Sequence, residues 1–151
     1  MKTKKMSKKT KIALFVTLGV VALLVIAAIV MYSVYAASPL PMAERFQRAV
    51  EENDSAAFYD CIDPDARVSV RRIQMVTGAS LSRLVQYATN TTEYDTEEKI
   101  TYRLTDYRRT GDAAVLTLRA SAADGREWDA TLSAVRRSGE WYVAIKSADA
   151  S

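Results

Sequence analysis

The feature that most constrains this chain is an uninterrupted run of 26 uncharged residues from Ile12 to Ala37. A helix needs about 20 apolar residues to cross the hydrocarbon core of a bilayer, which is about 30 Å thick. We therefore expect a transmembrane helix over the whole run. A cleavable signal peptide is the alternative, because Val34-Tyr35-Ala36 offers small residues of the kind that signal peptidase accepts. The length favours an anchor, since signal peptides usually contain only about 7 to 15 apolar residues.

A lysine-rich tail precedes this run and predicts its orientation. Positively charged flanks stay in the cytoplasm, so we expect residues 1–11 inside and residues 38–151 outside the cell membrane. The lysines would also attract anionic lipid headgroups. They are Lys2, Lys4, Lys5, Lys8, Lys9 and Lys11.

The net charge of the chain is unevenly distributed. The sequence pI is about 9.0, yet six of the 21 basic residues lie in the tail and all 18 acidic residues follow the span. Residues 38–151 therefore carry a net charge of −3. Because the excess of positive charge lies beside the membrane, we expect lipid and not nucleic acid as its partner.

The residue content also limits the chemistry. Histidine is absent, which removes the commonest general base and the commonest metal ligand. The five glycines are too dispersed to form a phosphate-binding loop. We expect no metal and no cofactor. The single cysteine, Cys61, excludes an internal disulfide and is expected to be a small buried apolar residue.

Helical signals dominate the first part of the outer segment. The Ser38–Pro41 segment is expected to end the span, and an amphipathic pattern from Met42 predicts a helix ending near Asn53. Asp54 or Ser55 can cap a second short helix, which is expected to end before Pro64. A third helix is expected over Val68–Thr77, closed by Gly78, and a fourth after a cap at Ser80. The polar stretch 89–98 predicts a loop.

The pattern changes to strict alternation after Lys99 and predicts four antiparallel strands. Tight turns are expected around Gly111, Gly125 and Gly139. At the second turn we expect Leu118 to face Trp128 and Arg119 to face Glu127. One face of this sheet is apolar, so the helices are expected to cover it. The sequence thus predicts an α+β domain.

These elements resemble the NTF2-like superfamily. The resemblance is carried by AERFQRAVEENDSAAFYDCIDPDA and by four strands that end in Gly-Glu-Trp-Tyr-Val, within residues 39–147. It implies helices packed on a curved four-stranded antiparallel sheet shaped like a cone. It does not imply one activity, because the superfamily includes isomerases, dehydratases, transport factors and membrane-tethered modules. One span with an external domain of this kind also resembles assembly subunits of bacterial secretion and conjugation machines.

A repeated turn is the most specific feature of the outer segment. Arg-Arg-Thr-Gly-Asp at 108–112 and Arg-Arg-Ser-Gly-Glu at 136–140 both join successive strands. The first and third turns of a meander lie at the same end of the sheet, about 10 Å apart. We predict an interaction patch of Arg108, Arg109, Arg136 and Arg137. The alternative is that these arginines only confer solubility and block edge pairing.

A pocket inside the cone is a second candidate site. Asp106 would continue the inward parity of Tyr102, and a carboxylate beside a phenol can act in acid–base catalysis when it is buried. The aromatic residues would otherwise be ordinary core. The candidate pocket residues are Tyr59, Tyr87, Tyr102, Asp106, Trp128 and Trp141.

Taken together, the residues favour a function without catalysis. We expect a membrane-tethered, extracytoplasmic protein-binding or scaffolding module whose partner is another membrane or envelope protein of a bacterium. The alternative is a small apolar-ligand binder, or a carboxylate-dependent isomerase or dehydratase that uses the cone interior. No catalytic residue is assigned.

Overall fold

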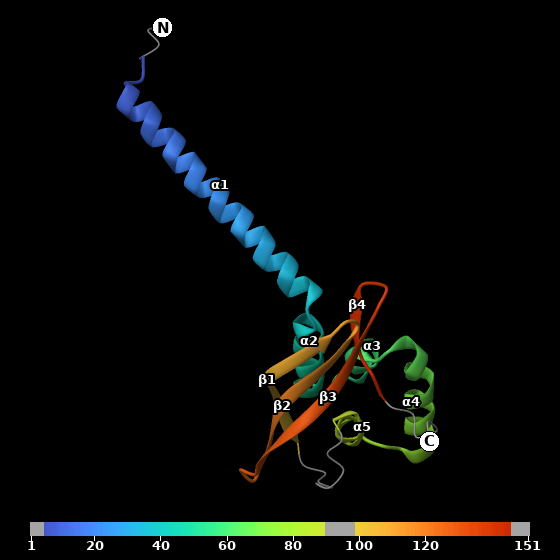
Figure 1. Cartoon of the computed structure of the whole chain (residues 1–151). Coiled ribbons are helices and arrows are strands. Elements are labelled where there is room, and N and C mark those ends of the chain that lie inside the picture. The colour runs from blue at the N-terminus through green and yellow to red at the C-terminus, as the bar shows by residue number, and fades with distance from the viewer. Residues whose placement is uncertain (1–4, 90–98, 146–151) are drawn as a thin grey trace. The chain divides into compact units, whose positions relative to one another are not determined.

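The computed structural model describes residues 5–89 and 99–145, and it divides the chain into two compact units, residues 1–36 and 37–151 (Figure 1). The loop expected at 89–98 lies outside the described residues from residue 90 onward.

The first unit is built around one long helix, α1 (Lys8–Ala37). No residue of α1 is buried, and its best 18-residue window has a mean hydropathy of 3.0. At 1.5 Å per residue the helix is about 45 Å long, which exceeds the hydrocarbon core of a bilayer. Among the described residues, α1 is the one helix long and apolar enough to cross a membrane. A signal sequence near the N-terminus has the same character.

The second unit contains a four-stranded antiparallel sheet in the order β1-β2-β3-β4, so the predicted meander is confirmed. The strands are β1 (Ile100–Thr110), β2 (Ala113–Ala122), β3 (Glu127–Arg137) and β4 (Glu140–Val143). Buried and exposed residues alternate along β2 and β3. We call the face that packs on the helices the inner face and the other the outer face.

The second hairpin differs from its predicted register by two residues. Arg119 pairs with Asp129, and Glu127 pairs with Ser121. The prediction was wrong because the turn is centred one residue later than expected, on Asp124: the Ala122 N–H donates to the Arg126 carbonyl at 2.9 Å. A shift of two residues keeps every side chain on its expected face.

A bulge interrupts β1. Leu104 pairs with Leu118, whereas Asp106 pairs with Thr117, so Thr105 is the extra residue. After the bulge, each residue of β1 points to the face opposite to the one that regular alternation would give it. Asp106 consequently lies on the exposed outer face, and the prediction that it points into the cone is wrong.

Four short helices complete the second unit: α2 (Leu40–Glu51), α3 (Ser55–Cys61), α4 (Pro64–Thr77) and α5 (Leu81–Ala88). The predicted caps are confirmed, since the side chains of Asp54 and Ser80 accept hydrogen bonds from Ala57 N and Arg83 N. The third of the predicted helices begins earlier than expected, at Pro64. Its start is fixed by the Asp63 carboxylate, which accepts from Asp65 N, and proline suits the first turn of a helix.

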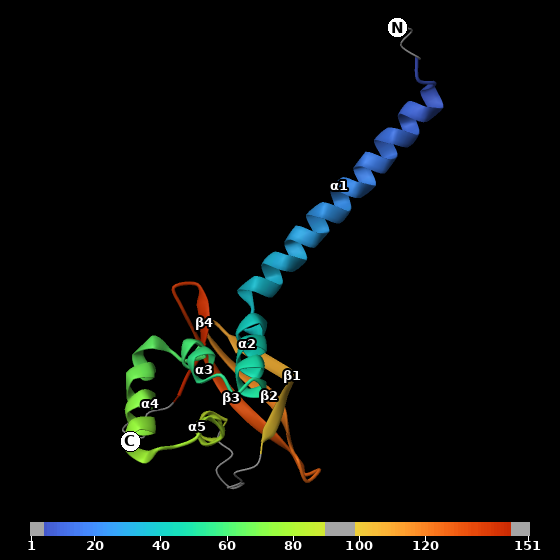
Figure 2. The same ribbon diagram turned by 180° about the vertical axis from the view of Figure 1, so that it is seen from behind.

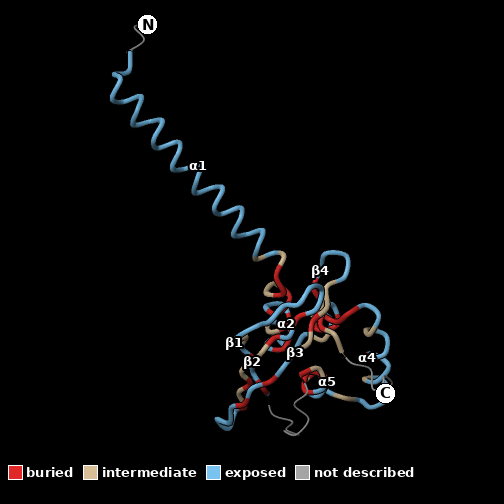
Figure 3. The backbone as a smooth tube through the Cα atoms, viewed as in Figure 1, coloured by how far each residue is buried: buried red, intermediate tan, exposed pale blue. Residues whose placement is uncertain are grey.

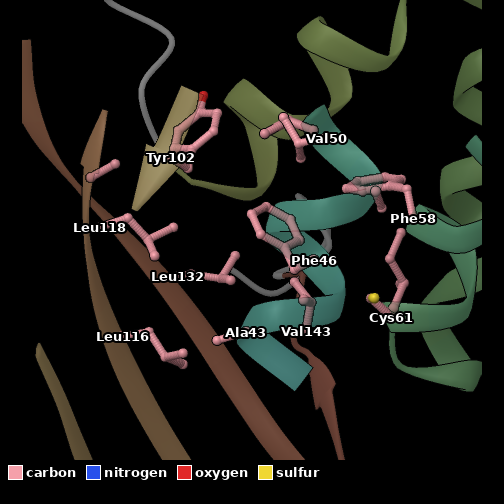
Figure 4. Packing of buried hydrophobic residues seen from close by; sticks show 14 of the residues in the cluster. Ala43, Phe46, Val50, Phe58, Cys61, Tyr102, Leu116, Leu118, Leu132 and Val143 are labelled. Carbon is pink, nitrogen blue, oxygen red and sulfur yellow. The ribbon is translucent and has the colours of Figure 1, made fainter. Parts of the chain in front are cut away.

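The core lies between α2 and the inner face of the sheet (Figures 2 and 3). Figure 4 shows Ala43 and Phe46 of α2 facing Leu116, Leu118 and Leu132. Each large apolar side chain buried in this way contributes about 1.5–3 kcal/mol. The α+β class predicted from the sequence is confirmed. The largest fully buried side chains include Met42, Phe46, Phe58, Ile62, Val85, Leu116, Leu118, Leu132 and Val143.

The helical layer is also joined to the sheet through the backbone. Ile62 forms a parallel bridge with Val143, and the Asp63 N–H donates to the Val143 carbonyl at 2.9 Å. The segment between α3 and α4 therefore extends the edge of the sheet beside β4.

Candidate functional site

The two arginine-containing turns lie at the same end of the sheet, as predicted. The Arg136 N–H donates to the Asp112 carbonyl at 2.7 Å, which links the first hairpin to the third strand. We call this end, formed by residues 108–112 and 136–141, the turn end. Arg108 and Arg136, the first residues of the two turns, are 28 positions apart in the sequence, and the meander brings the turns together.

The bulge in β1 places Arg109 on the inner face, where Arg109 pairs with Ala114. The Arg109 guanidinium carbon lies 5.3 Å from the centroid of the Trp141 ring, a cation–π distance. Its Nε donates to the Gly111 carbonyl at 3.0 Å, and its Nη1 lies 3.4 Å from the Ala37 carbonyl oxygen. Arg109 is therefore held by its own turn and by the first residue of the second unit.

Trp141 contacts the same carbonyl more closely. Its indole Nε1 donates to Ala37 O at 2.9 Å, and the side chain is buried. The last carbonyls of a helix have no partner within the helix and need outside donors. Ala37 ends α1, so Trp141 and Arg109 satisfy an acceptor that would otherwise remain unpaired.

Arg137 does not join the other three arginines as a free cation. Its Nε and Nη2 lie 2.9 and 2.8 Å from Asp63 Oδ2, and Nη2 lies 3.3 Å from Asp65 Oδ2. The hydrogen bond that Arg137 donates to Asp63 and the negative charge of that carboxylate raise the pKa of Arg137. Arg137 thus binds the start of α4, and the predicted patch of four arginines is reduced to three.

The remaining charges at the turn end leave a small positive excess. Arg108 is exposed and pairs with Val115 on the outer face. Arg136 is half-buried, and within the described part of the chain its Nε has no hydrogen-bond partner. With Arg109 these residues give three positive charges, against the exposed carboxylates of Asp112 and Glu140.

The six candidate pocket residues do not gather in one place. Tyr59 is buried, donates its hydroxyl to Gln74 and lies under Arg71, 5.0 Å from ring centroid to guanidinium carbon. Burial raises the pKa of Tyr59, and the Arg71 cation opposes this shift. Tyr87 is exposed on α5, and Asp106 lies on the outer face.

The two tryptophans lie at opposite ends of the sheet. Trp128 pairs with Ala120 near the second hairpin, whereas Trp141 belongs to the turn end. Both side chains are buried on the inner face, as core residues would be.

A cavity of about 350 Å³ lies at the end of the sheet away from the turn end. Of the predicted pocket residues, only Tyr102 lines it. The described lining residues include no carboxylate, and the Lys99 ammonium donates to the Glu51 carbonyl at 2.9 Å. Sequence reasoning missed this cavity because it forms between α5 and the start of β1, which no local pattern brings together. The lining residues are Val50, Asn53, Ser80, Leu81, Ser82, Val85, Lys99, Ile100 and Tyr102.

The surface of α4 carries exposed apolar side chains. Val68 is 65% exposed, and Met75 and Val76 are each 81% exposed. Spacings of seven and eight residues place all three within a stripe about 100° wide. Val70, on the opposite side of the helix, is buried. The sequence could have revealed this surface, because α4 has apolar residues on two opposite sides and only one side of a helix can face the core. We call Val68, Met75 and Val76 the α4 ridge.

Cys61 is a free, buried thiol, which confirms its predicted role as a small core residue. Burial raises its pKa, an effect that Arg45 partly offsets. No cluster of three metal-binding side chains occurs among residues 5–89 and 99–145.

Comparison with known proteins identifies no family. No family model and no curated protein matches the sequence. Among solved structures, a SEC-C motif containing protein from Rhodopseudomonas palustris is 17% identical, with a TM-score of 0.43 over 72% of this chain and 77% of that chain. A candidate polyketide cyclase from Sinorhizobium meliloti is 16% identical, with a TM-score of 0.45 over 70% of this chain and 94% of that chain. Similarity at this level does not assign the chain to a family.

Proposed function

We propose that the chain is a single-pass protein of a bacterial cell membrane, and that residues 38–151 form an extracytoplasmic protein-binding or scaffolding module without catalysis. The length and composition of α1 support the anchor. The lysines of residues 1–11 support a cytoplasmic N-terminus.

We further propose that the second unit has an NTF2-like fold. Two features support this assignment: the helix pair α2–α3 precedes a four-stranded meander, and α2 packs on its inner face. The bulge in β1 adds the local bend that a cone-shaped sheet needs.

The observation that carries the binding function is the α4 ridge. An isolated exposed apolar residue is common, but three on one stripe form a surface that a partner can bury. The exposed Arg72 lies on the same stripe, between Val68 and Val76. The partner that fits is another membrane or envelope protein with an apolar groove bordered by carboxylates.

Site-specific photo-crosslinking in intact cells tests this proposal. A photoreactive residue in place of Met75 should give a discrete crosslinked product, and Val76→Glu in the same chain should abolish it. Thr131, exposed on the outer face of β3, is the matched control position and should give none. Equal products from both positions, or none from Met75, would reject the α4 ridge as the binding surface.

A reporter fusion tests the proposed topology separately. An enzyme that is active only outside the cytoplasm, fused after Ser151, should be active, while the lysine tail should be protected from external protease. An inactive reporter would overturn the extracytoplasmic assignment.

The cavity favours a second candidate function, the binding of a small apolar ligand. Its volume of about 350 Å³ is within the range of ligand sites in proteins, which is about 300–1,000 Å³. The described lining supplies a phenol and an ammonium group but no carboxylate, so it supports binding more than isomerisation or dehydration. Native mass spectrometry of the purified chain tests this candidate: a co-purifying small molecule that is lost in Val85→Trp would support it.

A further inference from the structure

We propose that the free edge of β1 pairs antiparallel with the same edge of a second copy of the chain, with Arg103 of each copy opposite Asp106 of the other. The two four-stranded sheets would then join into one. This surface differs from the α4 ridge, so the inference goes beyond the proposed function.

The edge of β1 is open in the described part of the chain. β1 lies at one side of the sheet, and β2 is its one strand neighbour among the described residues (Figures 1 and 2). No backbone hydrogen bond joins its 11 residues to any described segment other than β2. From Thr105 to Thr110 every residue is exposed. An open strand edge presents N–H and C=O groups with which a further strand can pair.

The bulge decides which strand fits this edge best. Arg103 and Asp106 both lie on the outer face, since they pair with Arg119 and Thr117 of β2. They are three positions apart, whereas regular alternation places residues two positions apart on the same face. A regular strand on this edge would have to skip one residue, as β2 does. A second copy of β1 carries the same extra residue, so the two strands have equal numbers of residues between Arg103 and Asp106.

The charges select one register for this pair. Each exposed Arg103 lies opposite an exposed Asp106 on the outer face, and opposite charges across a strand pair are stabilising. Sliding the copy by one step of the alternation in either direction brings Arg103 opposite Arg103 or Asp106 opposite Asp106, which is destabilising. Charges and bulges usually protect an edge from pairing. On β1 they still reject unrelated strands, but their pattern matches a second copy.

The inner face is compatible with the same register. Tyr102 pairs with Ala120 and Tyr107 with Leu116, so both tyrosines lie on the inner face. The register places Tyr107 of each copy opposite Tyr102 of the other. Tyr107 is 37% exposed in the single chain, so pairing would cover an aromatic ring that now lies at the edge.

Disulfide crosslinking in cells that express two differently tagged forms of the full chain tests the proposal. Both forms carry Cys61→Ala; one also carries Arg103→Cys and the other Asp106→Cys. Opposite residues in an antiparallel pair have Cα atoms about 4.5–5.5 Å apart, which a disulfide can bridge. Mild oxidation should give a product with both tags as the main crosslinked species, and each form alone should give several-fold less.

The matched control replaces Arg103→Cys with Arg119→Cys. Arg119 lies on the same face but on β2, about 4.8 Å farther from the edge, so it should give no product with Asp106→Cys. An equal yield from the control, or no product from the Arg103→Cys and Asp106→Cys forms, would overturn the proposal.

Charge reversal tests the register independently. In sedimentation of the purified full chain in detergent, Arg103→Asp and Asp106→Arg should each weaken self-association several-fold, and the double variant should recover it. Arg126→Asp makes the same change of charge at the second hairpin, where the Arg126 side chain is 52% exposed, and should leave self-association unchanged. Equal association of all variants, or no recovery in the double variant, would show that the β1 edge is not the contact.

Discussion

The Arg137 guanidinium binds the Asp63 carboxylate through two nitrogens, with Nε and Nη2 at 2.9 and 2.8 Å from Oδ2. Asp63 also caps α4, and its N–H donates to the Val143 carbonyl. Only 9% of the Asp63 side chain is exposed. One aspartate thus joins the start of α4 to both β3 and β4.

We predict that Asp63→Ala lowers the free energy of unfolding by about 1–2 kcal/mol, because α4 loses its N-cap acceptor. Urea unfolding followed by tryptophan fluorescence measures the change. The control is Asp65→Ala, which removes a carboxylate that is 78% exposed and should change stability by no more than about 0.5 kcal/mol. Equal effects of the two substitutions would show that the cap contributes little.

We predict that residues 37–151 fold without α1. The buried cluster lies entirely between Met42 and Val143, so removal of α1 exposes no core. A single cooperative urea transition, with the same midpoint by circular dichroism and by fluorescence, is the expected result. A molten product would mean that the α4 ridge must be covered before the unit becomes stable.

We predict that Asp106→Ala changes stability by no more than about 0.5 kcal/mol, because the bulge places this residue on the exposed face. The comparison is Leu118→Ala on the adjacent strand, where a fully buried leucine is removed at a cost of about 2–5 kcal/mol. Thermal unfolding of both variants measures the contrast. A large loss in Asp106→Ala would contradict the register of β1.

We predict that Cys61 reacts with thiol reagents only when the second unit opens, since the side chain is buried. Its folded-state pKa is raised by burial, so the neutral thiol is favoured in the native state. The resulting stability is fully present below the ordinary thiol pKa of about 8.5 and is lost as the pH rises through the folded value. The unfolding midpoint of the parent protein should therefore fall more steeply in this range than that of Cys61→Ala. Rapid labelling of the native protein at neutral pH would contradict the burial.

Local signals in the sequence predicted much of this fold. Asp54, Ser80 and Gly78 mark helix ends through contacts with residues only a few positions away, and all three do so in the structure. The meander followed from alternation and from turn glycines, such as Gly111 with its φ of +61°. These helix ends and turns can be predicted without knowing which distant parts of the chain they contact.

The parts that could not be predicted depend on distant partners or on one extra residue. Asp63 and Arg137 are 74 positions apart, so no local pattern relates them. The bulge at Thr105 leaves no mark in a stretch where polar residues continue on both faces. The apolar residues of the α4 ridge are visible in the sequence. Their exposure could not be predicted, because it depends on how α4 is attached to the sheet.

The bulge gives β1 two halves that are out of phase with each other. Deleting Thr105 would remove the bulge and still leave Arg109 opposite Ala114 and Arg108 opposite Val115. A strand that kept Thr105 but paired it regularly would instead place Arg108 on the face that holds Trp141. The pairing of one threonine thus decides which of two adjacent arginines stacks on the tryptophan, and the order of the arginines in the sequence does not.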